Sequence, residues 1–291
     1  MTDASNNLRG SLLMMASMAA FVFNDASMKG LSDEIPLFQA IFLRGLLTSF
    51  LMVILAQQNG SLSFHFAASD RLLIAIRTAA EIGATVFFIT ALFKMPLANA
   101  TAILQVLPLA VTLAGALFLR EAIGWRRLIA ILIGFIGVML IVQPGTEGFS
   151  IYSIFVILAV VLVTVRDLTV RKLSPNVPSL SVALISALGV TAFAGLASIG
   201  EQWVFPSRLA LVQLVAASIF IIGGYVFSVM TMRFGDISAV TPFRYTSLLW
   251  ALLLGWIAFG DWPNGLTLIG ATIVVATGIF TLVRERQLAQ R

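Results

Sequence analysis

Hydrophobic runs of roughly twenty residues constrain this chain more than any other feature of its sequence. A run of about 20 apolar residues is long enough to cross a ~30 Å hydrocarbon core as an α-helix. Ten such runs are present, at residues 10–30, 36–57, 71–93, 97–119, 125–142, 149–171, 178–199, 209–232, 238–259 and 263–283. Only 11% of the 291 residues are charged, which is too few to solvate a globule of this size. The sequence therefore predicts an all-α membrane protein with ten transmembrane helices.

The second half of the chain repeats features of the first half. The matched pairs are Asp25 and Asp167, Lys29 and Arg171, Gly83 and Gly223, Gly115 and Gly255, and Glu121 and Asp261. The first two pairs are 142 positions apart (167 − 25) and the others 140 (223 − 83). Each half holds five runs, an odd number, so the second half must enter the membrane in the opposite direction. We predict two inverted five-helix repeats, residues 1–145 and 146–291, with a substrate site between them near the midplane.

Basic residues are distributed unevenly between the two ends of the predicted bundle. The end that holds the N-terminus carries Arg71, Arg120, Arg126, Arg127, Arg171, Lys172, Arg233, Arg284, Arg286 and Arg291. The opposite end carries Asp33, Glu34, Glu147, Glu201 and Asp261, with Lys29, Lys94 and Arg208 as its bases. This asymmetry follows the positive-inside rule and predicts that both termini are cytoplasmic. The net charge of +5 then reflects membrane topology, and no nucleic-acid partner is expected.

Several of these positions together form the pattern of a known family. They are the pair Asp25 and Lys29 at the end of the first run, Arg44 in the second, the segment from Gly115 to Glu121 that ends the fourth, and residues 242–246 through Gly260 and Asp261 in the ninth. With the five-plus-five organisation, this pattern resembles the EamA group of the drug/metabolite transporter superfamily over nearly the whole chain. Asp261 departs from the glutamate that is more usual there, but it keeps the charge. The resemblance implies a secondary carrier in a bacterial inner membrane, for amino acids, nucleosides, vitamins or drugs.

Ionisable and aromatic residues inside the runs are the candidates for substrate binding or coupling, because a charge inside the bilayer is costly. They are Asp25, Lys29, Arg44, Arg77, Glu81, Arg166, Asp167, Tyr225, Arg244, Tyr245 and Trp250. Three acid–base pairs lie four residues apart, on one helical face: Asp25 with Lys29, Arg77 with Glu81, and Asp167 with Arg171. Each pair is either a structural ion pair or part of the transport machinery. Arg44 and Arg166 have no such partner, and the adjacent Asp167 is not expected to face Arg166.

Arg244 stands out among the arginines. It follows Pro242, whose ring and missing N–H loosen the local helix, and it precedes Tyr245 and Trp250. An arginine beside aromatic rings can bind a carboxylate or phosphate while a ring covers the substrate, which predicts a substrate with a negative or zwitterionic group. The alternative is an arginine that extends to the cytoplasmic surface.

Four further features have mainly structural interpretations. Tyr225 follows two glycines and offers a hydroxyl, although such glycines more often serve close helix packing. Pro108 is expected to kink the fourth span. Ala130 and Gly134 form a small-xxx-small pattern, which suits helix packing or a homodimer face. His65 is a lone loop histidine and is not expected to bind a metal.

Three function classes compete: a secondary transporter, an intramembrane enzyme and a channel. The inverted repeat and the charges of mixed sign favour the transporter, with the bilayer and a small-molecule substrate as its partners. The chain has no cysteine and no Walker loop, so no metal, cofactor or ATP is expected. A proton-driven carrier needs a carboxylate that titrates freely. Asp25, Glu81 and Asp167 each have a cation one turn away, which leaves open proton coupling, exchange and facilitated transport.

Overall fold

A computed structural model describes residues 3–58, 66–119, 124–145, 149–234 and 240–289. These ranges contain ten helices that are long and apolar enough to cross a membrane, and no strand, which confirms the predicted fold class. The elements are α1 (Asp3–Lys29), α2 (Leu37–Gln58), α3 (Ala68–Lys94), α4 (Leu97–Leu104), α5 (Leu107–Leu119), α6 (Trp125–Val142), α7 (Ile151–Arg171), α8 (Ser179–Ala197), η1 (Ser198–Gly200), α9 (Arg208–Phe234), η2 (Thr241–Tyr245), α11 (Thr246–Phe259) and α12 (Gly265–Ala289). His65, Arg120, Glu121, Glu147 and Arg291 lie outside the described residues, as do the side chains of Arg233, Arg284 and Arg286.

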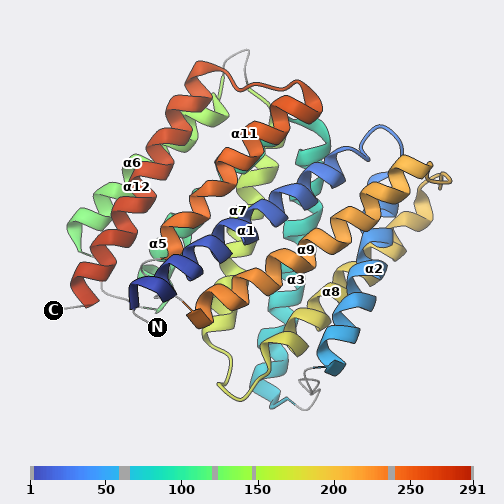
Figure 1. The fold of residues 1–291 in the computed structure, drawn as a ribbon, viewed down its shortest axis with the longest axis horizontal. Helices are drawn as coiled ribbons and strands as arrows, with labels where there is room; N and C mark the ends of the chain where they lie inside the picture. Colours follow the sequence, from blue (N-terminus) through green and yellow to red (C-terminus); the bar gives the residue numbers. More distant parts are fainter. Residues whose placement is uncertain (1–2, 59–65, 120–123, 146–148, 235–239, 290–291) are drawn as a thin grey trace.

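The helix bounds repeat with the spacings found in the sequence. Helix α8 begins 142 positions after α2 (179 − 37). Helix α9 begins and ends 140 positions after α3 (208 − 68 and 234 − 94), and α12 begins 140 positions after α6 (265 − 125). The fold is therefore two five-helix repeats of opposite direction. The start of α1 and the end of α12 lie at the same end of the bundle (Figure 1). The predicted division after residue 145 adjoins residues outside the described ranges and stays a prediction.

The helix pairs show where the two repeats are related by symmetry. Helix α1 lies along α9, and α3 lies along α7, so these two pairs exchange when the repeats exchange (Figure 1). Helix α2 packs on α8, and α6 packs on α12; each of these is a pair of equivalent helices. Ser49 Oγ and Thr191 Oγ1, which are equivalent positions (191 − 49 = 142), lie 3.4 Å apart. The pseudo-two-fold axis therefore passes between α2 and α8 at this contact.

Glycines bring α6 and α12 together within the chain. A Cβ on Gly134 would lie 2.9 Å from Thr277 Oγ1, and a Cβ on Gly137 would lie 2.9 Å from the backbone oxygen of Gly270. The small-xxx-small pattern of Ala130 and Gly134 thus serves packing inside the protein. Because this face of α6 is covered by α12, it does not support the predicted homodimer. The homodimer stays a prediction.

Prolines interrupt the fourth and ninth spans. Helix α4 ends at Leu104, the residue four before Pro108, and α5 begins at Leu107, so the helix is interrupted where Pro108 was expected to kink it. The ninth span begins as the 3₁₀ segment η2, which contains Pro242, and continues as α11. Gln105 Nε2 donates to Ser247 Oγ at 2.6 Å, so the two breaks are joined to each other.

Hydrogen bonds tie loops to helices at the end of the bundle where α1 finishes, which we call the Lys29 end. The Glu201 carboxylate accepts from the backbone N–H groups of Phe38 (3.2 Å) and Gln39 (3.0 Å) at the start of α2. An acid at a helix N-terminus satisfies N–H groups that have no partner inside the helix. Gln39 also exchanges two hydrogen bonds with the backbone of Val204, at 2.7 and 3.1 Å. The α8–α9 connection is thereby fixed to α2.

Candidate functional site

A cavity of about 80 Å³ lies between α2, α3, α8 and α9. Ten of its thirteen lining residues form five repeat-equivalent pairs. The pairs are Arg44 and Ser186, Gly45 and Ala187, Thr48 and Val190, Glu81 and Ile221, and Thr85 and Tyr225, with spacings of 142 (186 − 44) on α2 and α8 and 140 (221 − 81) on α3 and α9. The cavity is therefore centred on the pseudo-two-fold axis. We call it the central cavity.

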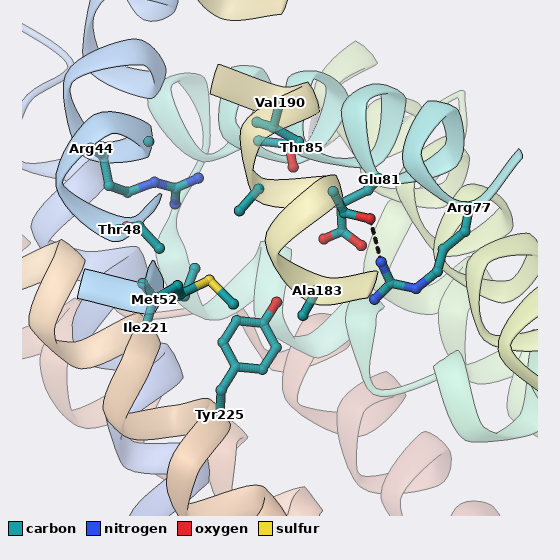
Figure 2. A pocket seen from close by; sticks show the side chains of 13 residues that line it. Arg44, Thr48, Met52, Arg77, Glu81, Thr85, Ala183, Val190, Ile221 and Tyr225 are labelled. Carbon is teal, nitrogen blue, oxygen red and sulfur yellow. Dashed lines mark hydrogen bonds between the residues drawn. The ribbon is translucent and has the colours of Figure 1, made fainter. Parts of the chain in front are cut away.

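The two repeats contribute different chemistry to the central cavity. Arg44, Arg77 and Glu81 come from the first repeat, whereas the second repeat supplies small, aliphatic and hydroxyl-bearing side chains. Figure 2 shows Arg44 and Arg77 approaching from opposite sides, with Glu81 and the Tyr225 hydroxyl between them. The site thus combines positive charge, hydroxyl groups and an apolar wall in one volume, which is typical of a pocket for a small polar organic molecule.

Arg44 is buried, with 7% of its surface exposed. Its Nη1 donates to Asn24 Oδ1 on α1 at 3.4 Å, which is a long hydrogen bond. Asn24 in turn donates from Nδ2 to Asp25 Oδ1 at 2.8 Å. An uncharged amide therefore stands between the guanidinium of Arg44 and the carboxylate of Asp25.

Lys29 does not pair with Asp25, contrary to one interpretation of their spacing. Its Nζ donates to the backbone oxygens of Met95 (2.8 Å) and Leu92 (3.4 Å), and it lies 5.3 Å from the centre of the Phe259 ring. The carbonyl groups in the last turn of a helix have no partner within the helix and attract a cation. Lys29 thus joins α1 to the end of α3 and to α11, away from the central cavity.

Arg166 joins two carboxylates. Its Nε and Nη2 each lie 2.9 Å from Asp167 Oδ1, and its Nη1 lies 3.1 Å from Glu81 Oε2 on α3. The expectation that Arg166 does not face Asp167 was therefore wrong, and its second acid, Glu81, lies on another helix. The guanidinium stands at the end of a long flexible side chain, which can turn back towards a neighbour on the same helix. Arg77 donates to Ser186 Oγ and not to Glu81, so the predicted ion pair between Arg77 and Glu81 is replaced by these contacts.

Arg244, Tyr245 and Trp250 lie outside the lining of the central cavity. Tyr245 is buried, and its hydroxyl is directed at α12, where a Cβ on Gly278 would lie 1.6 Å from it. The Trp250 ring packs 6.5 Å from that of Phe23. Arg244 is half-buried and within electrostatic range of Asp167. The fold thus does not place the Tyr245 hydroxyl beside the guanidinium, and a substrate contact at Arg244 stays a prediction.

Tyr225 does line the central cavity, and its glycine neighbour explains how α9 reaches it. A Cβ on Gly224 would lie 2.6 Å from the ring of Phe21, so α1 and α9 approach closely there. The rings of Phe21 and Tyr225 are 5.5 Å apart in an edge-to-face arrangement. The glycines therefore serve close packing, and this packing orients the tyrosine.

Apart from Tyr225, the uncharged members of the site were missed in the sequence. Thr48 lies one helical turn after Arg44, and Ser186 is the repeat equivalent of Arg44 (186 − 44 = 142). Both could have been found by applying the repeat spacing to the intramembrane arginine and by following its helical face. The sequence argument considered charged and aromatic side chains, and hydroxyl groups are too common in membrane helices to stand out alone.

Ten spans in two inverted repeats, with a polar cavity on the axis between them, define a multi-pass membrane transporter. The model of the EamA-like transporter family matches residues 8–143 and again residues 150–284, so the chain belongs to this family. Among curated relatives, an S-adenosylmethionine uptake transporter of Rickettsia felis is 26% identical over 100% of this chain and 98% of its own. The relatives carry names of transporters, which agrees with the expectation that the protein is not an enzyme.

Two further relatives differ in what their names say they carry. A riboflavin transporter of Vibrio cholerae is 28% identical over 73% of this chain and 71% of its own. The pseudopaline exporter CntI of Pseudomonas aeruginosa is 24% identical over 94% of this chain and 96% of its own. A crystal structure with 19% identity superposes with a TM-score of 0.65 over 97% of this chain and 98% of its own. At that identity the likeness shows the fold alone.

Proposed function

We propose that the protein is a secondary transporter that moves a small polar organic metabolite across the membrane by alternating access through the central cavity. The observation that carries this proposal is the lining of the cavity by equivalent positions of two inverted repeats. When two such repeats exchange their conformations, the cavity stays in place while access to it moves from one face of the membrane to the other. The names of the relatives include both uptake and export, and they support a metabolite without fixing its identity or direction.

The hydrogen bonds at the Lys29 end support a conformation that is closed there. Glu201, Gln39 and Lys29 each bridge two elements at that end. Opening it requires these bonds to break. Net hydrogen bonds contribute about 0.5–1.5 kcal/mol each, and those to charged groups about 1.5–3. The three residues make six such bonds, and a bound substrate together with new contacts at the opposite end must offset their loss.

Membrane location and orientation also belong to the proposal. The positive-inside distribution supports both termini in the cytoplasm, and the bacterial relatives support an inner membrane. Fusion of a reporter that is active only in the cytoplasm to the C-terminus should give activity. Activity only from a periplasmic reporter at the same position would overturn this orientation.

Transport itself is tested with a panel of labelled compounds in cells that contain or lack the protein. The panel comprises S-adenosylmethionine, riboflavin, amino acids and nucleosides, and both uptake and retention are measured. Ala187→Phe fills the central cavity, whereas Leu188→Phe places the same ring on a side chain that is 46% exposed on the outer face. Ala187→Phe should abolish a transport activity that Leu188→Phe retains. Equal transport by both variants at equal expression would remove the cavity from the pathway.

Coupling to protons is proposed through Glu81, with exchange or facilitated transport as the alternative. Glu81 is the carboxylate that lines the central cavity, and Arg166 Nη1 contacts both of its oxygens, at 3.1 and 3.3 Å. If protonation of Glu81 drives transport, Glu81→Gln should lose pH-dependent transport while the protein remains folded. Unchanged pH-dependent transport in this variant would reject Glu81 as the coupling group.

A further inference from the structure

Thr48 carries a hydroxyl that finds no partner among the residues the structure describes. The side chain is 6% exposed, lines the central cavity, and has no hydrogen bond within the described part of the chain. The buried residues Thr164, Thr191, Thr231, Thr277 and Thr281 instead donate to the backbone oxygen four residues earlier. For Thr48 that oxygen belongs to Arg44, and the Thr48 hydroxyl does not bond to it. A polar group buried without a partner is costly, so a ligand that satisfies it would offset that cost.

The two arginines of the central cavity are also incompletely satisfied. A guanidinium has five N–H donors. Within the described ranges, the side chain of Arg44 has one hydrogen bond, the long contact to Asn24 at 3.4 Å. Arg77 donates from Nη1 to Ser186, while its buried Nε finds no acceptor among the described residues.

The carboxylates in and beside the cavity are already engaged. The Glu81 carboxylate is contacted by Arg166, and the Asp25 carboxylate is reached by Asn24 and not directly by Arg44. The unmet hydrogen-bonding capacity of Arg44, Thr48 and Arg77 is therefore almost entirely donor capacity. A complementary ligand must supply acceptors, and an anionic group with several oxygens matches guanidinium groups best because it can accept two parallel hydrogen bonds from one fork.

We propose that Arg44 and Thr48 form a subsite for an anionic oxygen group of the substrate, a carboxylate or a phosphate, and that Arg77 adds positive charge on the other side of the cavity. This inference rests on the proposed transport function and names its substrate class as organic anions, including zwitterions that carry such a group. Arg44 and Thr48 lie one turn apart on one face of α2, and Arg77 enters the cavity from the opposite side on α3, with Glu81 between (Figure 2). Met52, Val190 and Ile221 provide an apolar wall for the remainder of the molecule.

Binding is measured on the full chain in lipid nanodiscs, as the shift of its thermal unfolding with added probe. The probes are acetate, benzoate and 3-phenylpropanoate, each beside its uncharged amide, together with inorganic phosphate and phenyl phosphate. At least one anion should stabilise the protein when its uncharged counterpart does not. Comparison of the carboxylates with the phosphates shows which oxygen group the subsite takes. If no anion in the panel stabilises the protein more than the matched amides do, the proposal is overturned.

Variants then locate the effect. Arg44→Gln should weaken binding of the anion by about tenfold or more, and Thr48→Val by several-fold, because each removes a donor to a charged group. Arg44→Lys keeps the charge and loses the fork, so it should bind more weakly than the parent while folding normally. Thr281→Val and Arg71→Gln are matched controls, since Thr281 bonds within α12 and Arg71 bonds the Phe66 carbonyl, both outside the cavity. Parent-like anion binding in Arg44→Gln and Arg44→Lys would refute the subsite.

Failure of this subsite and failure of the transport proposal have different signatures. Transport of a neutral substrate that is unaffected by Arg44→Lys and Thr48→Val would overturn the anion subsite and leave the transporter intact. The opposite result is a protein that binds an anion through Arg44 but transports none of the panel compounds. That result would support the subsite and overturn the transport proposal.

Discussion

Replacing Arg166 with glutamine should leave the carboxylates of Glu81 and Asp167 without the cation that joins them. The guanidinium lies 2.9 Å from Asp167 and 3.1 Å from Glu81, and these carboxylate side chains are 33% and 18% exposed. Removing one member of a fully buried ion pair costs about 3–5 kcal/mol, whereas an exposed pair contributes about 1 kcal/mol or less. The carboxylates of Asp167 and Glu81 are neither fully buried nor fully exposed. We therefore expect Arg166→Gln to lower the free energy of unfolding by an intermediate amount, about 2–3 kcal/mol.

A second substitution tests whether the loss comes from unpaired charge. In Arg166→Gln with Glu81→Gln, one of the two uncompensated carboxylates is gone, so about half of the loss should be recovered. The assay is unfolding in mixed dodecyl maltoside and sodium dodecyl sulfate micelles, followed by circular dichroism. The control is Arg126→Gln, an exposed arginine 5.3 Å from the Trp125 ring, which should change the unfolding free energy by about 1 kcal/mol or less. Effects of Arg166→Gln and Glu81→Gln that simply add would refute the reasoning.

Three other substitutions give separate outcomes. Tyr245→Phe removes a buried hydroxyl that has no partner among the described residues, so thermal unfolding should stay unchanged or shift upward; a clear loss of stability would contradict this. Lys29→Gln should lower the unfolding midpoint, because the bond to the Met95 carbonyl loses its charge, and an unchanged midpoint would show that this contact contributes nothing. If Arg244 binds the substrate, Arg244→Lys and Arg244→Gln should weaken substrate binding with little effect on folding; parent-like binding in both would assign Arg244 to the membrane surface.

The spans and the repeat could be predicted because both depend on features that are local in sequence. Twenty apolar residues are required wherever a helix crosses the bilayer, so the number of spans follows from counting such runs. The repeat spacings of 142 and 140, seen first in pairs such as Asp25 and Asp167, reappear in the helix bounds. The interruption before Pro108 also follows from the proline alone.

Side-chain partners could not be predicted, because they depend on helices that are distant in sequence. Lys29 bonds to carbonyl groups 63 and 66 residues away, and these are available only because α3 ends beside α1. Arg166 contacts Glu81, 85 residues earlier, because α7 packs along α3. An acid and a base four residues apart on one helix are close enough to form an ion pair. Whether they do so depends on the hydrogen-bonding groups that neighbouring helices offer to each of them.

Distances between spin labels at the two ends of the bundle test the central claim, that access to the cavity alternates. The chain has no cysteine, so labels attach only at introduced sites. One pair is Asp33→Cys with Arg208→Cys at the Lys29 end, and the other is Asn176→Cys with Ala68→Cys at the opposite end; all four positions are exposed. In nanodiscs with a transported compound, each pair should show two distances, and the Lys29 end should lengthen as the opposite end shortens. Distances that change in the same direction, or that stay fixed while transport proceeds, would contradict alternating access.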